Sequence, residues 1–317
     1  MRPTVFVAAV CMALSSLPCV ASESEAISWR LGKTDTFTID ASITQTGNGG
    51  KDRVYRDSTY SLTLRVTSVA ENGAAEVVLK VESARIRATV EGKSLEVDTE
   101  KPAEETPATP DRLAFIAELA GKEFSLCIAP GGAGDVLPVV DGFFPQAPDN
   151  PARQPLAGDF QELLEFVFNF APPGEAVQER TWKKFLPVPL SRTFSGVGDA
   201  MEERKYDLGR RGSCHDNDYV EIMLKSTLCK PAEGATTIGG TGQLEGPEAE
   251  KQGEEKGPKP PAPPQGSGSG SYRFVSEGGW LLSGEMKRIV SAKIDRKECR
   301  LETKVSVEFA KESGTDK

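Results

Sequence analysis

Histidine is almost absent from this sequence, which contains only His215 among its 317 residues. A Ser-His-Asp triad or a Cys-His pair must therefore use His215 or not exist. His215 lies close to Asp216 and Asp218 in a polar run that is typical of a solvated turn. These three side chains are the weak candidates for a metal site, because the run lacks the glycine and the later glutamate of a calcium loop. We predict no catalytic residues, no bound metal and no other cofactor.

Long hydrophobic runs are also missing, so the sequence predicts no transmembrane helix. The apolar run Val5–Leu14 is too short to span a bilayer. It follows Arg2 and precedes a string of small residues, which is the order of a signal peptide, and we predict one over residues 1–22. The sequence has no Asn-x-Ser/Thr site, so nothing suggests a glycosylated eukaryotic secretory protein. We expect a bacterial protein that is exported to the periplasm or cell envelope.

Positive charge is in deficit, with 38 basic against 47 acidic residues and a net charge of −9. This balance argues against non-specific binding to nucleic acid. The hydrophobic fraction of 38% is that of a globular protein with a small core, and it suggests that part of the chain stays unpacked. An apolar ligand or an envelope protein remains as the expected kind of partner.

The clearest structural signal is the stretch Tyr60–Val90, in which apolar and polar residues alternate over two runs. Asn72-Gly73 separates the runs, and this combination predicts a β-hairpin. The alternation changes phase near Ser83-Ala84, where we expect a β-bulge that bends the sheet. Similar alternation over residues 27–43, 136–140 and 300–309 predicts further strands.

Two segments have the period of a helix instead, at about 110–120 and 159–170. The fold class that follows is mainly β, with antiparallel curved sheets or half-barrels and two short helices on one face. The second helix carries an apolar stripe, which is typical of a hydrophobic core and is also suited to line a pocket for an apolar ligand. The stripe consists of Phe160, Leu163, Leu164, Val167 and Phe168. The acid pairs Glu162/Glu165 and Glu202/Glu203 are interpreted as solvated charges.

The distribution of proline and glycine predicts how the mature chain is divided. Residues 23–145 form an N-terminal β half with one helix. A proline-rich linker follows at 146–158, and residues 159–311 form a C-terminal β half with the other helix. Residues 231–271 interrupt this second half with a Pro, Gly, Glu and Lys composition that predicts a disordered insert.

Four cysteines remain after the predicted signal peptide, and an even number in an oxidising compartment favours two disulfides. Counting strand ends places Cys229 and Cys299 at the same end of the sheet, so we predict that bridge. Cys127–Cys214 then follows by elimination. Four reduced, buried thiols are the alternative.

Several segments resemble an uncharacterised family of exported, β-rich bacterial proteins of the planctomycete type. The segments are residues 28–37 (SWRLGKTDTF), 62–75 (LTLRVTSVAENGAA), 119–130 (LAGKEFSLCIAP) and 272–284 (YRFVSEGGWLLSG). The family tends to carry Gly-Asp-x-Trp after its central helix, whereas this chain has Glu179-Arg180-Thr181-Trp182. The resemblance implies export and a β fold, and it brings no known activity.

The leading hypothesis for function is therefore a non-enzymatic binding or scaffold protein of the bacterial cell envelope. The alternative is a periplasmic carrier that holds a lipid or other apolar ligand in a curved-sheet pocket. A hydrolase is the third hypothesis, and it has the least support because the sequence offers no catalytic constellation.

Overall fold

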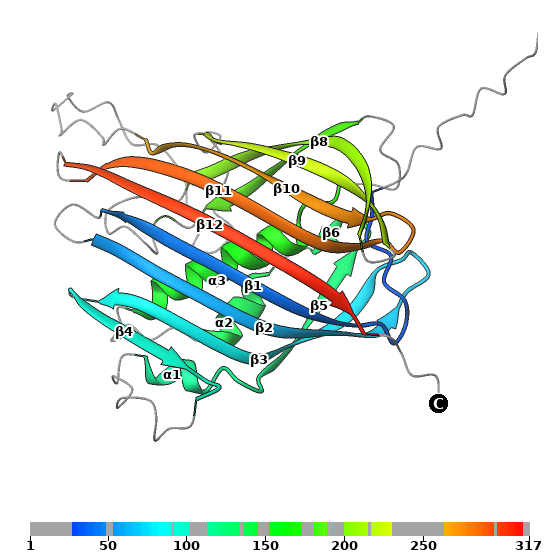
Figure 1. The fold of residues 1–317 in the computed structure, drawn as a ribbon, viewed down its shortest axis with the longest axis horizontal. Helices are drawn as coiled ribbons and strands as arrows, with labels where there is room; N and C mark the ends of the chain where they lie inside the picture. The colour runs from blue at the N-terminus through cyan, green and yellow to red at the C-terminus, as the bar shows by residue number, and fades with distance from the viewer. Residues whose placement is uncertain are drawn as a thin grey trace, which may run out of the picture.

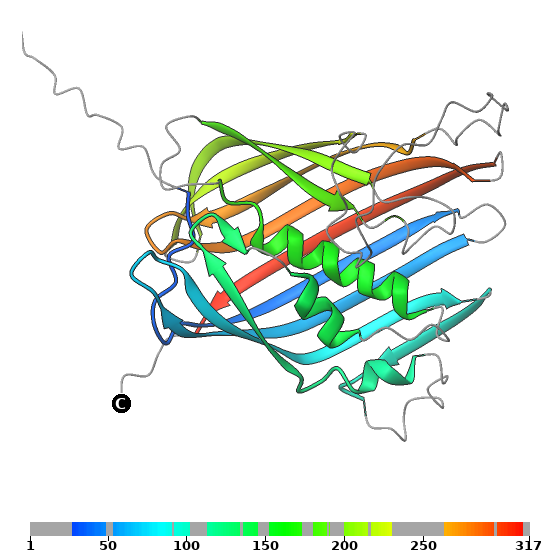
Figure 2. The same ribbon diagram turned by 180° about the vertical axis from the view of Figure 1, so that it is seen from behind.

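The computed structural model describes residues 27–48, 53–90, 92–101, 113–133, 136–144, 152–172, 180–188, 190, 200–214, 217–229, 263–294 and 297–312. The predicted signal peptide and most of the predicted insert lie outside these ranges. The described residues form one antiparallel, open and curved sheet of twelve strands, with helices on one side of it (Figures 1 and 2). The predicted fold class is confirmed.

The strands have the following bounds. They are β1 Thr36–Asn48, β2 Arg53–Val69, β3 Ala75–Val90, β4 Lys93–Asp98, β5 Glu123–Ala129, β6 Gly132–Ala133, β7 Thr181–Val188, β8 Ala200–Cys214, β9 Asn217–Cys229, β10 Gln265–Val275, β11 Trp280–Ile294 and β12 Lys297–Lys311. Their order in the sheet is β6-β5-β3-β2-β1-β12-β11-β10-β9-β8-β7, and β4 pairs with β3. The first and last long strands are therefore neighbours, since β1 pairs with β12 over its whole length. Strands from both predicted halves belong to one sheet.

The hairpin predicted at Tyr60–Val90 is formed by β2 and β3. Gly73 in the turn has a φ of 79°, a value that glycine adopts at little cost. The amide of Ala74 donates to Oδ1 of Asn72 in the same turn. The register shifts opposite Ser61 and Leu62, which leaves Glu82 as the extra residue. The bulge expected near Ser83-Ala84 is confirmed to within one residue.

The helices differ more from the prediction. They are α1 Ala114–Ala117, α2 Leu137–Phe143 and α3 Arg153–Phe168. The first is shorter than the expected 110–120. The third begins inside the expected linker, because a proline such as Pro155 is tolerated in the first turn of a helix, where the amides lack intrahelical acceptors.

The segment 136–140 was predicted as a strand, and this was wrong. It belongs to α2, whose buried residues Val139, Val140 and Phe143 follow a helical spacing. A short apolar run of this kind cannot be distinguished from a strand by its sequence alone. The segment 27–35 was also predicted as part of a strand, but the first strand begins only at Thr36.

The predicted insert 231–271 ends earlier than expected, because residues from Gln265 onward belong to β10. This strand alternates glycine with serine up to Ser271. A side chain has no room at Gly268, where a Cβ atom would lie 2.6 Å from Oγ of Ser226 and 3.2 Å from Cβ of Arg288. Tertiary packing therefore makes a strand from a sequence that has a low intrinsic β propensity.

We expect Gly270→Ala to lower the free energy of unfolding by about 2 kcal/mol, measured by urea denaturation. A Cβ atom at Gly270 would collide with the backbone oxygen of Glu285, and such overpacking forces the backbone to move. Ser269→Ala on the same strand is the control, because Ser269 is exposed on the opposite face and its loss costs about 0.5 kcal/mol or less. Equal stability of the two variants would contradict this packing.

The hydrophobic core lies between one face of the sheet and the helices α2 and α3, which Figure 2 shows in front of the strands. This face of the sheet is called the inner face below, and the opposite one the outer face. Helix α3 is buried along most of its length, from Leu156 to Phe168. The inner face thus has almost no contact with solvent beneath this helix.

Candidate functional site

The predicted apolar pocket is part of the core. Its five members, Phe160, Leu163, Leu164, Val167 and Phe168, are at most 2% exposed. The ring of Phe160 lies 5.1 Å from that of Tyr60 on β2, and the ring of Phe168 lies 6.1 Å from that of Trp29. Such close aromatic packing is that of a filled interior. The outer-face groove described below is lined by none of these residues.

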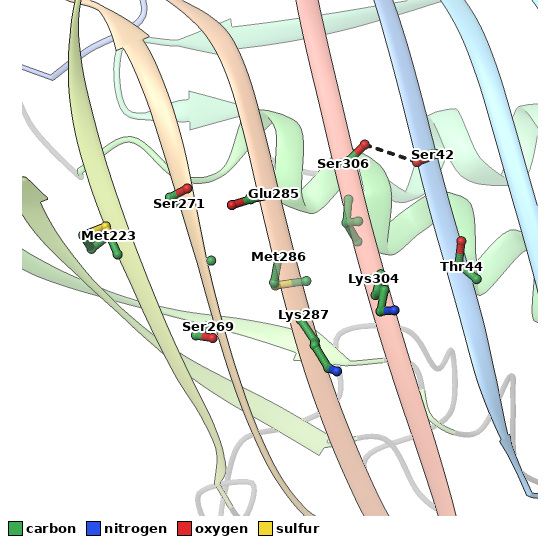
Figure 3. A pocket seen from close by; sticks show the side chains of 12 residues that line it. Ser42, Thr44, Met223, Ser269, Ser271, Glu285, Met286, Lys287, Lys304 and Ser306 are labelled. Atoms are coloured by element: carbon green, nitrogen blue, oxygen red, sulfur yellow. Dashed lines mark hydrogen bonds between the residues drawn. The ribbon is translucent and has the colours of Figure 1, made fainter. Parts of the chain in front are cut away.

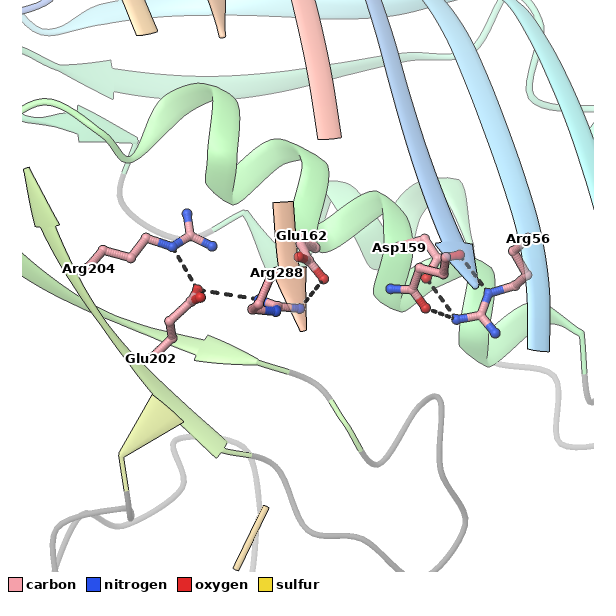
Figure 4. A network of polar contacts seen from close by, with 7 residues as sticks. Arg56, Asp159, Glu162, Glu202, Arg204 and Arg288 are labelled. Atoms are coloured by element: carbon pink, nitrogen blue, oxygen red, sulfur yellow. Dashed lines mark hydrogen bonds and ion pairs between the residues drawn. The ribbon is translucent and has the colours of Figure 1, made fainter. Parts of the chain in front are cut away.

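A second stripe on α3 is acidic and is also buried. Asp159 accepts two hydrogen bonds from Arg56 on β2, at 2.7 Å from Nε and 3.0 Å from Nη2. Three residues further on, Glu162 accepts a bond of 2.7 Å from Nη2 of Arg288 on β11. Figure 4 shows these two contacts side by side along the helix. Residues three apart share one face of a helix, so the stripe fixes the rotation of α3 above the sheet.

Arg288 connects the helix to a further pair on β8. Its Nη1 atom lies 3.3 Å from Oε2 of Glu202, and the same oxygen accepts a bond of 2.7 Å from Nε of Arg204 (Figure 4). The side chains of Glu202, Arg204 and Arg288 are at most 2% exposed. Two carboxylates and two guanidinium groups thus form a buried network, which we call the ionic network, consisting of Glu162, Glu202, Arg204 and Arg288.

The two carboxylates of the ionic network have opposite pKa shifts. Burial raises the pKa of Glu162 above its usual value, and the nearby charge of Arg288 offsets this only in part. Burial would also raise the pKa of Glu202, but the charges of Arg204 and Arg288 outweigh it and lower the pKa to about 2. Burial likewise raises the pKa of Asp159 despite the contact with Arg56. A separation of this kind occurs in acid–base catalysis, yet these carboxylates are buried and bound to arginines, which suits a structural role.

Our interpretation of the acid pairs as solvated charges was wrong for three of the four residues. Glu162, Glu165 and Glu202 are buried, whereas Glu203 lies on the outer face and pairs with Lys183. The sequence did contain a signal, because Glu202 and Arg204 stand at the inward positions of a strand that also carries Tyr206. A charge at an inward position requires a buried partner.

A shallow groove of about 600 Å³ lies on the outer face, across strands β9 to β12 and β1. Figure 3 shows its lining from outside, with the helices behind the strands. Five of the twelve residues that line the groove carry hydroxyl groups, namely Ser42, Thr44, Ser269, Ser271 and Ser306. Three are charged, namely Glu285, Lys287 and Lys304, and the others are Met223, Gly270, Met286 and Val305. The groove exists because the middle of β10 places only the short side chains of Ser267, Ser269 and Ser271 on this face, between longer side chains on β9 and β11. Sequence reasoning missed the groove, since it interpreted the serines as part of a disordered insert.

The weak metal candidates gain no support. His215 and Asp216 lie outside the described residues, and Asp218 is exposed on β9. Within the described ranges, no group of three or more His, Cys, Asp or Glu side chains is arranged to hold a metal ion. None of the helices in those ranges is both long and apolar enough to cross a membrane.

The structure contains neither of the two predicted disulfides. Cys127, Cys214, Cys229 and Cys299 are all free. Cys229 and Cys299 do lie at the same end of the sheet, as their register through β10 and β11 shows. Their strands are separated by β10 and β11, however, which places them about 14 Å apart. A disulfide requires Cα atoms within about 7 Å. Counting strand ends placed both cysteines at the correct end of the sheet, but it could not show that two strands separate them.

No protein-family model and no curated protein matches the chain significantly. Among solved structures, one of lipid–protein interactions in lipovitellin is similar at 8% identity and a TM-score of 0.47, over 90% of this chain and 26% of that chain. A Bacteroides fragilis protein described as exported and of YmcC-like fold is 9% identical, with a TM-score of 0.25, over 88% of this chain and 97% of that one. A Vibrio parahaemolyticus domain described as an outer-membrane lipoprotein-sorting protein is 7% identical, with a TM-score of 0.17, over 90% and 88%. These similarities are too distant to define a family.

Proposed function

We propose that the protein is a non-enzymatic binding protein of the bacterial cell envelope, and that its binding surface is the outer groove. The observation that carries this proposal is the contrast between the two faces of the sheet. The inner face is filled by α3 and its aromatic contacts, whereas the outer face has an open groove lined by hydroxyl and charged groups. Polar groups that converge on a concave surface are typical of a ligand site.

The rigidity of the groove supports the same proposal. Its lining comes from strands that are paired over most of their length, and the opposite face of these strands packs on the core. Side chains held in this way lose little conformational entropy when they bind a ligand. Export to the envelope follows from the predicted signal peptide over residues 1–22, and the planctomycete-type resemblance agrees with it.

Filling the groove tests the proposal. We expect Ser269→Trp to weaken binding of the purified protein to isolated cell envelopes of its host by about tenfold, because the indole would occupy the space above β10. Ser61→Trp on β2 is the matched control, since Ser61 is on the outer face but outside the groove. Co-sedimentation measures the binding of each variant to the cell envelopes. Equal binding by Ser269→Trp and the wild type would refute the groove as the binding surface.

A carrier of a lipid or other apolar ligand is the competing function. It would require α3 to move away from the sheet, because the stripe from Phe160 to Phe168 already fills the interior. Movement of α3 would also separate Asp159 from Arg56 and Glu162 from Arg288, and breaking ion pairs between buried side chains is strongly unfavourable. Native mass spectrometry of protein purified from its host separates the two functions. A co-purifying lipid would favour the carrier, and a mass without ligand favours our proposal.

A further inference from the structure

Five lysines form a row on the outer face, one from each of five strands. The sheet register pairs Lys183 on β7 with Lys205 on β8, and Lys205 with Lys225 on β9. On the other side of β10, Lys287 on β11 pairs with Lys304 on β12. We call Lys183, Lys205, Lys225, Lys287 and Lys304 the lysine row.

The lysine row is continuous with the groove. Ser269 on β10 pairs with Lys225 on one side and with Lys287 on the other. Lys287, Lys304 and Ser269 line the groove, and Thr44 on β1 continues the row beyond Lys304. Figure 3 shows Ser269, Lys287, Lys304 and Thr44 on four consecutive strands.

Such a row is unfavourable for the sheet itself. Like charges that face each other on neighbouring strands are destabilising. Acidic neighbours offset part of the repulsion: Lys183 pairs with Glu203 at 2.5 Å and Lys205 with Asp207 at 3.3 Å, while Lys287 and Lys304 share Glu302. Lys225 makes no ion pair with any residue in the described part of the chain. Because exposed ion pairs are worth less than about 1 kcal/mol, these ammonium groups stay available to a ligand.

We propose that the groove binds an anionic polysaccharide that lies across the strands along the lysine row. This inference rests on the proposed function, and it names the class of ligand. The row spans five strand spacings, or about 24 Å, which suits a linear chain with repeated charges. The ammonium groups pair with carboxylate or phosphate groups of the chain, and the hydroxyls of Ser269, Ser271 and Ser306 bond to its sugar hydroxyls.

Other polyanions fit this surface less well. A peptide that binds by strand addition requires an unpaired strand edge, whereas the backbone beneath the groove is paired on both sides. Single-stranded nucleic acid would stack its bases on aromatic side chains, and none of the described residues that line the groove is aromatic. The net charge of −9 also repels polyanions away from the row, so the row confines them to one place.

Polygalacturonate oligosaccharides, which carry carboxylates, and neutral dextran oligosaccharides of equal length are suitable probes for calorimetric titration. We expect polygalacturonate to bind more tightly at low ionic strength and to lose affinity as salt is added. Lys225→Gln/Lys287→Gln removes the two lysines beside Ser269, and it should weaken polygalacturonate binding by about tenfold. Lys80→Gln/Lys293→Gln makes the same change of charge elsewhere on β3 and β11, and it should change the affinity by about twofold or less.

The outcomes separate this inference from the proposed function. In one outcome, dextran binds as tightly as polygalacturonate, with binding lost in Ser269→Trp but kept in Lys225→Gln/Lys287→Gln. That result would overturn the anionic ligand and leave the groove as a binding surface. Equal losses in the two double-lysine variants would show non-specific attraction and overturn the lysine row. Failure of both probes to bind, together with unchanged envelope binding by Ser269→Trp, would overturn both proposals.

Discussion

Glu202→Gln is expected to lower the free energy of unfolding by about 3 kcal/mol at pH 7, measured by urea denaturation. Oε2 of Glu202 lies 2.7 Å from Nε of Arg204 and 3.3 Å from Nη1 of Arg288, and all three side chains are buried. These contacts lower the pKa of Glu202 from 4.5 to about 2, a shift that corresponds to about 3 kcal/mol. The neutral amide would leave two buried guanidinium groups with less compensating charge.

Glu162→Gln is the matched control in the same network, and it is expected to cost about 1 kcal/mol or less. Burial raises the pKa of Glu162, so the folded state does not favour its charged form. A glutamine keeps an oxygen that can accept the bond from Nη2 of Arg288. Equal losses in the two variants would contradict the assignment of Glu202 as the main counter-charge of the arginines.

The dependence of stability on pH gives a second measurement of the same contrast. The folded-state pKa of Glu202 is lowered, so its contribution is present above pH 4.5 and is lost as the pH falls from about 4.5 to about 2. Glu162 has a raised pKa, so its contribution is present below pH 4.5 and is lost as the pH rises through that raised value. Glu202→Gln should therefore flatten the acid limb of the stability curve, and an acid limb as steep as that of the wild type would contradict the shift.

Trp29→Ala is expected to lower the free energy of unfolding by about 4 kcal/mol, because it empties a large buried volume. Trp29 is 2% exposed, and its ring contacts four aromatic rings at centroid distances of 5.5 to 6.2 Å. Those rings belong to Phe168, Phe170, Phe274 and Phe309. Its amide also donates to the backbone oxygen of Pro130 at 3.0 Å, which ties the segment before β1 to the β5–β6 turn.

Phe185→Ala provides the control for this truncation. Phe185 is 59% exposed on β7, so its removal should change stability by about 0.5 kcal/mol or less. The loss of unfolding free energy in Trp29→Phe should lie between those of the two alanine variants, since a smaller ring keeps part of the packing. A loss below about 1 kcal/mol in Trp29→Ala would show that the segment 27–31 is not part of the cooperative core.

The elements that the sequence predicted correctly are those with a strong local period. The hairpin of β2 and β3, its turn at Asn72-Gly73 and the bulge at Glu82 all follow from alternation with period two. Helix α3 was found from its apolar stripe, although its start was placed six residues too late. Helix α2 was missed, because the five consecutive apolar or proline residues 136–140 have no distinguishable period.

The candidate site was predicted less well than the fold. The aromatic stripe of α3 was recognised, and the structure places it in the core. The serines of β10 were assigned to disorder because their composition predicts it, and only the neighbours Ser226 and Arg288 explain why glycine is required at position 268. The prediction of a Cys229–Cys299 disulfide failed for a related reason, since the order of strands in a sheet is not a local property of the sequence.

Local sequence patterns were sufficient to predict a β protein with a curved sheet, an apolar helix to cover it and an acidic net charge. The three-dimensional fold was needed to show that β1 and β12 are neighbours, that Glu162 and Glu202 are buried with Arg288, and that five lysines share one row. The physical reason is the range of the interactions. Alternation and capping act over a few residues, whereas cross-strand register and the burial of a charge depend on partners that are distant in the chain.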